Sequence, residues 1–503
     1  MEVSLLYAKE WAREKPYPVA HILTKDRLKE ILKQDIAQRD SALWALSRAY
    51  KVRDFTGKPG EVLIVYPGSA EQNMQIYVAL GERETLTPTD FLNAGASLAK
   101  RLSGMTIEQI VLDLSHTGGM NAFTTLKPFI AGIAIGAYTF SKYVSHTQPF
   151  PLGTLEVIIP ETLALDASRQ AVAEAAYNVT ASNIARHLTN EAANNKTPEK
   201  FERVVRKLLA EHNLRIETIA AQSLIDKDLR LIHAVGRAGS APPRLMLISG
   251  QSRAKAFTLG LVGKAVTFDA GGLMLKSKTS LPYMGEDIAG AAAMVGLLSV
   301  IDHLHLDYNV VCAIPIAENL IDAKAYRPSD ILQTPHLSVE VNNTDAEGRL
   351  LLADSFNYLQ DVFQVDMIID VATLTGAISR ALGNRMAGYF TNNEALAALL
   401  CRAAERSMEK FWRMPLARSY DHQLDSDFAD VRNDGGEPKA ITAALFLHRF
   451  IRKGIPWLHL DIGQAINAPA WDLLYGGKSY ANGFPVLTLI ELLKELNQGR
   501  FST

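Results

Sequence analysis

The chain has 503 residues, too many for one ordinary domain, and its 48% hydrophobic and 21% charged residues are typical of globular proteins. Lys and Arg number 52 and Asp and Glu 54, so the near-neutral balance argues against a nucleic-acid partner or an anionic membrane surface. Only two cysteines are present, and no apolar run reaches the roughly 20 residues that cross a bilayer. We therefore expect a soluble, cytoplasmic protein without a disulfide framework.

The first third of the chain predicts a small α/β domain over residues 1–165. Short apolar runs alternate with stretches in which apolar residues recur at helical spacing, as in residues 90–102. That alternation is typical of a largely parallel sheet. The predicted strands are residues 62–66, 75–80, 109–114 and 155–159.

A long alanine-rich stretch follows, residues 162–188, without Gly or Pro. It predicts a helix that connects two domains, and we assign residues 166–188 to it. A polar cluster at residues 189–198 ends this helix, and Pro198 starts the next one at residues 199–211.

The remaining chain, within a predicted catalytic domain of residues 166–503, alternates again. Several of its predicted strands are apolar throughout, as buried parallel strands are. We therefore predict a mostly parallel, twisted central sheet flanked by helices. The predicted strands are residues 245–249, 258–268, 309–316, 366–371 and 457–462, and the predicted helices are residues 289–304 and 350–362.

Two segments carry residues suited to chemistry. In the first, Lys264 and Asp269 lie in or just after an apolar strand, and two glycines follow. Ligand sites of α/β sheets lie beyond the carboxyl ends of strands, and glycine lets the backbone approach a ligand closely. Lys276 comes next, and Asp287 precedes a helix of small residues.

The second segment places Asp345, Glu347 and Arg349 at alternating positions. In an extended conformation these side chains share one face. Asp345 and Glu347 offer, together with Asp269 and Asp287, four carboxylates without His or Cys. This donor set suits divalent cations. Any one of these charges is more often a solvated surface group, and a salt-bridged turn is the alternative for the second segment. The joint pattern favours a two-metal site.

Two other motifs are weaker evidence for a functional site. The glycine-lysine pair at residues 263–264 lacks the first glycine and the Ser or Thr of a phosphate-binding loop. The HLHLD run at residues 303–307 resembles a metal motif but lies at the end of a predicted helix and before a strand, where a solvated helix end is the better interpretation. His459 is expected to be structural.

The motifs resemble those of one family. NTDAEGRL at residues 343–350 is similar to the signature of the leucyl aminopeptidase (cytosol aminopeptidase) family, and residues 263–272 resemble its other metal-binding stretch. Agreement continues through ATLTGA at 372–377, SDFADVRN at 426–433, ITAALFL at 441–447 and HLDI at 459–462. The resemblance covers most of residues 180–503 and is looser over the first 165.

The resemblance implies a metal-dependent aminopeptidase that releases an N-terminal Leu or similar apolar residue from short peptides through a metal-bridging hydroxide. The implied cofactors are two divalent ions, Zn²⁺ or Mn²⁺ with Co²⁺ as an option. Their implied ligands are Lys264, Asp269, Asp287 and Glu347 for one ion, and Asp269, Asp345 and Glu347 for the other, with the Asp345 carbonyl.

Further roles follow from the same resemblance. Lys276 would polarise the scissile carbonyl, and Arg349 would hold a bicarbonate that acts as general base. The side-chain pocket would be lined by Met284, Thr373, Gly376 and Gly463. A homohexamer is also implied.

Two departures from the family pattern bear on substrate preference. Glu286 lies between Met284 and Asp287, where the family often has a basic residue, and Gly463 replaces a small alanine. Within the peptidases, the alternative is a Cys-Gly or other dipeptidase. Outside the enzymes, the alternative is a DNA-binding or other binding role.

Overall fold

The computed structural model describes residues 1–10, 17–33, 41–66, 74–115, 121–146, 150–250, 257–467, 474 and 481–498. The chain forms two compact units, whose main parts are residues 1–179 and residues 180–468. Helix α5 (Leu165–Asn190) runs through the division between them, and the predicted boundary after residue 165 falls at its start. None of the described helices is long and apolar enough to cross a membrane.

The N-terminal unit contains a six-stranded sheet in the order β1-β6-β5-β2-β4-β3. Every neighbouring pair is parallel except β3 and β4. The first two strands were not predicted, and β1 has the mixed exposure of an edge strand. The strands are β1 (Glu2–Tyr7), β2 (Val19–Thr24), β3 (Val62–Val65), β4 (Gln75–Gly81), β5 (Gln109–Asp113) and β6 (Thr154–Ile159), and the helices are α1 (Lys25–Leu32), α2 (Ala42–Lys51), α3 (Pro88–Leu102) and α4 (Leu126–Gly136).

The second unit contains a nine-stranded sheet in the order β16-β15-β18-β14-β9-β11-β8-β7, with β10 also paired to β11. Its centre, from β18 to β11, is parallel, and antiparallel pairs lie on both sides of it. The predicted mostly parallel α/β fold is confirmed. The strands are β7 (Arg215–Ala220), β8 (Arg244–Ser249), β9 (Thr258–Gly263), β10 (Ala265–Asp269), β11 (Asn309–Asn319), β14 (Met367–Ala372), β15 (Ala387–Thr391), β16 (Phe411–Arg413) and β18 (Trp457–Asp461).

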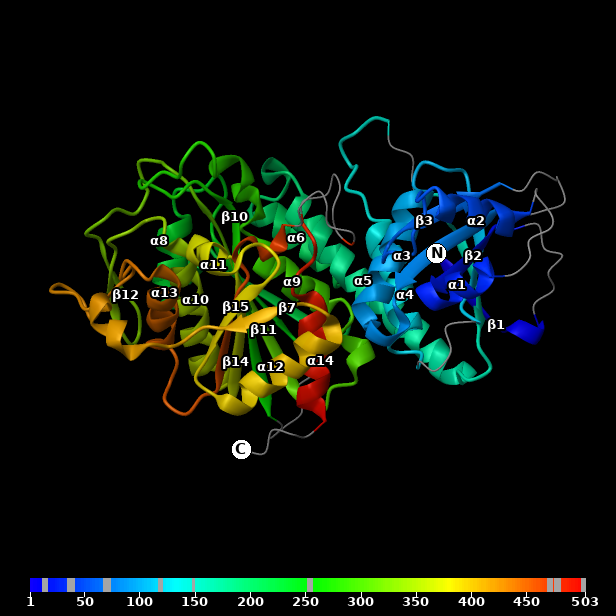
Figure 1. Ribbon diagram of the computed structural model, residues 1–503. Helices are drawn as coiled ribbons and strands as arrows, with labels where there is room; N and C mark the ends of the chain where they lie inside the picture. The colour runs from blue at the N-terminus through cyan, green and yellow to red at the C-terminus, as the bar shows by residue number, and fades with distance from the viewer. Residues whose placement is uncertain are drawn as a thin grey trace. The chain divides into compact units, whose positions relative to one another are not determined.

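Helices cover both faces of this sheet. Helices α8 (Arg230–Gly236), α10 (Glu347–Tyr358) and α13 (Lys439–His448) lie on one side, and α9 (Ala289–Leu298), α12 (Glu394–Ser407) and α14 (Val486–Asn497) on the other (Figure 1). Every residue of α9 is buried, which its small and apolar sequence allows. The unit also contains α6 (Pro198–Leu208), α7 (Gln222–Asp226), α11 (Gly376–Leu382) and a small sheet of β12 (Ile331–Gln333), β13 (Ser338–Glu340) and β17 (Val431–Arg432).

The single strand predicted at residues 258–268 is wrong in one respect, because it is divided at Lys264 into β9 and β10. Both parts pair with β11, but β14 pairs only with β9. At the break, the Lys264 N–H still donates to Val371 O at 3.1 Å, whereas its carbonyl accepts from Ala291 N at 2.9 Å. The start of α9 therefore takes the place of a neighbouring strand, and Lys264 lies at the interruption.

The predicted ends of two helices also differ. The helix expected at residues 289–304 ends at Leu298, and a short 3-10 turn follows at Ile301–Leu304. The helix expected from residue 350 begins earlier, at Glu347. This earlier start places a carboxylate in the first turn, where the helix dipole favours negative charge.

Candidate metal centre

The predicted ligands lie at ends of secondary-structure elements. Lys264 separates β9 from β10, and Asp269 is the last residue of β10. Asp287 follows the 3-10 helix Leu281–Glu286 and precedes α9, and Glu347 begins α10. Since these ends meet beyond the carboxyl end of a parallel strand, the residues reach one site from four separate segments.

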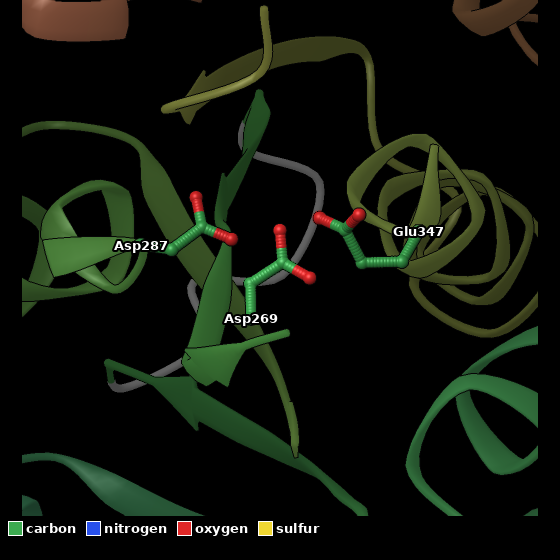
Figure 2. Close-up of side chains that lie close together, drawn as sticks. All are labelled: Asp269, Asp287 and Glu347. Carbon is green, nitrogen blue, oxygen red and sulfur yellow. The ribbon is translucent and has the colours of Figure 1, made fainter. Parts of the chain in front are cut away.

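Three carboxylates converge there. Asp269, Asp287 and Glu347 each offer one oxygen within 4.8 Å of the others, and all three are buried. Figure 2 shows their carboxylates turned toward a common space. Among the residues that the structure describes, residues 303–307 do not belong to such a group.

Lys264 lies on one side of this space. Its Nζ is 2.7 Å from Asp287 Oδ1 and 2.9 Å from Glu347 Oε1, and it donates to Thr373 O at 3.1 Å. The side chain is almost fully buried. Burial alone would lower the pKa of Lys264, but the charges of Asp287, Glu347 and Asp269 raise it above its ordinary value. Without a metal the amine is therefore an ammonium ion.

Lys276 lies on the other side and brings in the fourth acid. Its Nζ is 2.7 Å from Asp269 Oδ2 and 2.5 Å from Asp345 Oδ1. The Asp345 side chain is 35% exposed, far more than the other three acids. Asn319 donates from Nδ2 to Asp269 Oδ1 at 2.8 Å and so fixes the orientation of that carboxylate.

The positive charges of Lys264 and Lys276 do not fully compensate the negative charges of the acids. Burial, followed by the charges of Glu347 and Asp287, raises the pKa of Asp269 to about 8. Burial also raises the pKa of Asp287, although Lys264 opposes this. In the described part of the chain, Asp287 Oδ2 has no hydrogen-bond partner. Buried oxygens with raised pKa values and an unused acceptor fit divalent cations, which would displace the protons held here.

Arg349 lies in the same region, beside an acid that was not predicted. Its Nη1 donates to Asn433 O at 2.8 Å and lies 3.7 Å from Asp434 Oδ1. Asp434 was not predicted as a site residue. Its only sequence signal is its position, directly after the matching stretch that ends at Asn433.

A cavity of about 740 Å³ opens onto the cluster. The cluster residues, Lys276 and Arg349 line it, and so do the four residues predicted for the side-chain pocket, Met284, Thr373, Gly376 and Gly463. The structure thus brings all eleven predicted site residues to one cavity. Glu286 also lines it, and Asn467 Nδ2 donates to Glu286 Oε2 at 2.7 Å.

Some contacts had no sequence signal. Thr373, expected only in the pocket, donates from Oγ1 to Asp287 Oδ1 at 2.6 Å. Asp461 accepts from the backbone N–H groups of Leu374 and Thr375, each at 3.2 Å, and thereby anchors the turn that carries Thr373. His459 is buried and its Nδ1 lies 2.6 Å from Asp370 Oδ1, which is consistent with the expected structural role.

Comparisons with known proteins agree with this geometry. Residues 183–490 match the catalytic domain of the cytosol aminopeptidase family, and residues 27–147 match its N-terminal domain. The chain belongs to the cytosol aminopeptidase family. A probable cytosol aminopeptidase of Sinorhizobium fredii is 35% identical over 466 residues, which cover 89% of this chain and 90% of the relative. One from Syntrophotalea carbinolica is 35% identical over 470 residues, covering 92% and 94%.

Solved structures extend the family likeness to the fold. A variant of tomato leucine aminopeptidase is 28% identical with a TM-score of 0.85, covering 98% of this chain and 96% of its own. The bottromycin maturation enzyme BotP in complex with Mn is 31% identical with a TM-score of 0.83, covering 96% and 100%. Family membership supports a metal-dependent aminopeptidase activity, which makes the protein a hydrolase of the exopeptidase class.

Proposed function

We propose that this cytosol aminopeptidase uses two divalent cations to remove the N-terminal residue, preferably Leu or a similar apolar one, from short peptides. The observation that carries the proposal is the convergence of three buried carboxylates, with Asp345 beside them, at the wall of a cavity. Two cations, when bound, would supply a Lewis acid for the peptide carbonyl and an ionised water as the nucleophile.

The ligand roles come from the family resemblance. It implies that Asp269, which pairs with Lys276, and Glu347, which pairs with Lys264, bind both cations. Asp287 and Lys264 then complete one site, and Asp345 the other. Lys264 can serve as a ligand only after it loses its proton, which a nearby dication would favour.

Lys276 is the catalytic cation in this proposal. It lies at the cavity and has a raised pKa because the charges of Asp269 and Glu347 outweigh the effect of burial. It therefore stays protonated at neutral pH. An ammonium group at this position can stabilise the negative charge that develops on the carbonyl oxygen during attack.

The residues that line the cavity support the proposed preference for an apolar N-terminal side chain. Met284, Ile466 and Gly463 line the cavity, with Thr373 from the turn before α11 and Gly376, the first residue of α11. Gly463 has φ +34°, and an added Cβ would lie 2.5 Å from Ile378 Cγ2 and 2.7 Å from Ser379 Oγ. Glycine is therefore required here by packing against α11, and the departure from alanine gives no measure of substrate size.

The proposals for the metal, the place of action and the oligomeric state rest on similarity to other proteins of the family. The BotP complex with Mn supports Mn²⁺ as one candidate metal, and the predicted Zn²⁺ and Co²⁺ remain candidates. The family name supports action in the cytosol. The homohexamer predicted from the family resemblance remains a proposal.

Hydrolysis of leucinamide tests the proposal. The purified protein is assayed as isolated, after chelation and dialysis, and after addition of Mn²⁺, Zn²⁺ or Co²⁺, and the metal content of each sample is measured. We expect activity to disappear on chelation and to return with metal, in proportion to metal bound up to two ions per chain. Undiminished activity in metal-free protein would refute the proposal, as would full activity of Asp345→Ala or Glu347→Ala.

A dipeptidase specialisation, Cys-Gly hydrolysis included, is favoured by one further observation. Arg380 and Lys439 line the cavity, and either cation could bind the C-terminal carboxylate of a dipeptide. A panel of dipeptides and the corresponding aminoacyl amides, which lack this carboxylate, separates the two functions. A dipeptidase would prefer the free acids at least tenfold, and substitution of both Arg380 and Lys439 would abolish the preference.

A further inference from the structure

The cavity wall contains an ion pair that the family resemblance did not predict. Arg349 and Asp434 are both buried and both line the cavity, with Nη1 and Oδ1 3.7 Å apart. Arg349 comes from the first turn of α10 and Asp434 from the segment after β17. The pair thus joins two segments that are 85 residues apart.

Asp434 is held in place by several other bonds. Asn343 donates from Nδ2 to Asp434 Oδ2 at 2.6 Å, and Gly436 N donates to Oδ1 at 3.1 Å. Its backbone exchanges two hydrogen bonds with the side chain of Asn342. Burial would raise the pKa of Asp434, but Arg349 and these hydrogen bonds lower it below its ordinary value. The carboxylate is therefore ionised and fixed beside the guanidinium.

This arrangement does not suit a second anion at Arg349. Asp434 faces the guanidinium, and Nη1 already donates to Asn433 O, whereas in the described part of the chain the buried Nε is a donor without a hydrogen-bond partner. A bicarbonate at the free part of the guanidinium would lie next to an ionised, poorly solvated carboxylate. Like charges at such separations repel strongly in a partly buried site. The residues present therefore do not fit the bicarbonate that the resemblance implies.

We propose that Asp434 is the built-in anionic partner of Arg349 in this chain, so that peptide hydrolysis does not depend on bicarbonate. Asp434 is a positioning residue: it orients Arg349 at the cavity wall and balances its charge. The inference rests on the proposed aminopeptidase function, and it sets this chain apart from the expectation of a bicarbonate general base.

The parent enzyme provides the first test. Leucinamide hydrolysis by the metal-loaded protein is measured in buffer freed of carbon dioxide and again with added bicarbonate at constant pH and ionic strength. We expect rates that agree within a factor of two. A rise of fivefold or more with bicarbonate would overturn the proposal. No activity in either buffer would instead refute the proposed function, and the binding measurement below would then decide the role of Asp434.

The variant Asp434→Asn, which keeps the shape of the side chain and removes its charge, provides the second test. We expect bicarbonate to bind this variant about tenfold or more tightly than the parent, because the repulsion is gone. Binding is followed by ¹³C-bicarbonate NMR. Rates of the variant should be low without bicarbonate and rise at least fivefold with it. Asp427→Asn, at an exposed position, is the matched control.

Two results in the variant would contradict the inference. One is bicarbonate binding equal in parent, Asp434→Asn and Asp427→Asn. The other is a loss of activity in Asp434→Asn that bicarbonate does not restore although circular dichroism and metal content match the parent. If Asp434→Asn does not fold, the parent measurements alone decide.

Discussion

The two sides of the carboxylate cluster use the same element, a lysine between two acids, in different surroundings. On the closed side Lys264 contacts Asp287 and Glu347, and all three side chains are almost completely buried. On the open side Lys276 contacts Asp269 and Asp345, and its side chain is 17% exposed toward the cavity. Burial separates the two lysines: in the metal-free protein the closed one compensates charge within the fold, whereas the open one can reach a substrate.

The largest expected effect comes from Asp269, the acid that we propose as a ligand of both cations. Asp269→Asn should lower kcat on leucinamide by about a thousandfold or more, because both proposed cations lose a charged ligand. Metal content per chain should fall in the same samples. The exposed Asp427→Asn serves as control, and retention of both metal and turnover in Asp269→Asn would mean that the two sides do not share a ligand.

Exchange of the two lysines for methionine should separate structure from catalysis. In the metal-free protein, Lys264→Met leaves buried Asp287 and Glu347 without their counterion, and unfolding should require about 3–5 kcal/mol less free energy. Lys276→Met should keep most of its stability but lose about a hundredfold or more in kcat at normal metal content. Urea unfolding and steady-state kinetics measure the two effects. Equal losses of stability in both variants would contradict the distinction.

The pH dependence of stability tests the acids on both sides together. Burial and neighbouring acids raise the pKa of Asp269 to about 8, above the roughly 3.9 of an unfolded chain. The folded metal-free protein therefore holds a proton that the unfolded chain releases, and its stability should fall as pH rises from about 4 to 8. Relative to Asp269→Asn we expect a slope of roughly 1 kcal/mol per pH unit. If the free energy of unfolding changed with pH equally in the parent and in Asp269→Asn, the raised pKa of Asp269 would be contradicted.

The smallest expected effect concerns the packing of the closed side. An added Cβ at Gly348 would lie 2.6 Å from Lys264 Cε and 2.8 Å from its Nζ. Gly348→Ala gains roughly 1 kcal/mol of helix propensity but displaces the amine, so the net change in stability should be small. Metal affinity should nevertheless fall severalfold in an equilibrium competition with a chelator. Gly376→Ala, where an added Cβ meets only the end of Arg380 at 3.8 Å, is the control for helix propensity.

Much of the fold was predictable from local sequence pattern. Apolar runs identified β11, β14 and β18 in the parallel centre of the large sheet and the buried antiparallel strand β8, because buried strands are continuously hydrophobic. The missed strands β1 and β16 are partly exposed and carry little pattern, whereas β2 and β15 are largely buried and were missed too. The break at Lys264 was not predictable, since it depends on the approach of α9 from 25 residues further along the chain.

The sequence by itself determined the chemical inventory of the site: acids, lysines and glycines at strand ends, in an order that matches one family. Only the tertiary structure decided which lysine is enclosed, that Thr373 contacts Asp287, and that Asp434 reaches Arg349. The physical reason is the range of the forces involved. Strand and helix patterns reflect neighbours along the chain, whereas the charge and partners of a buried group depend on segments that folding brings together.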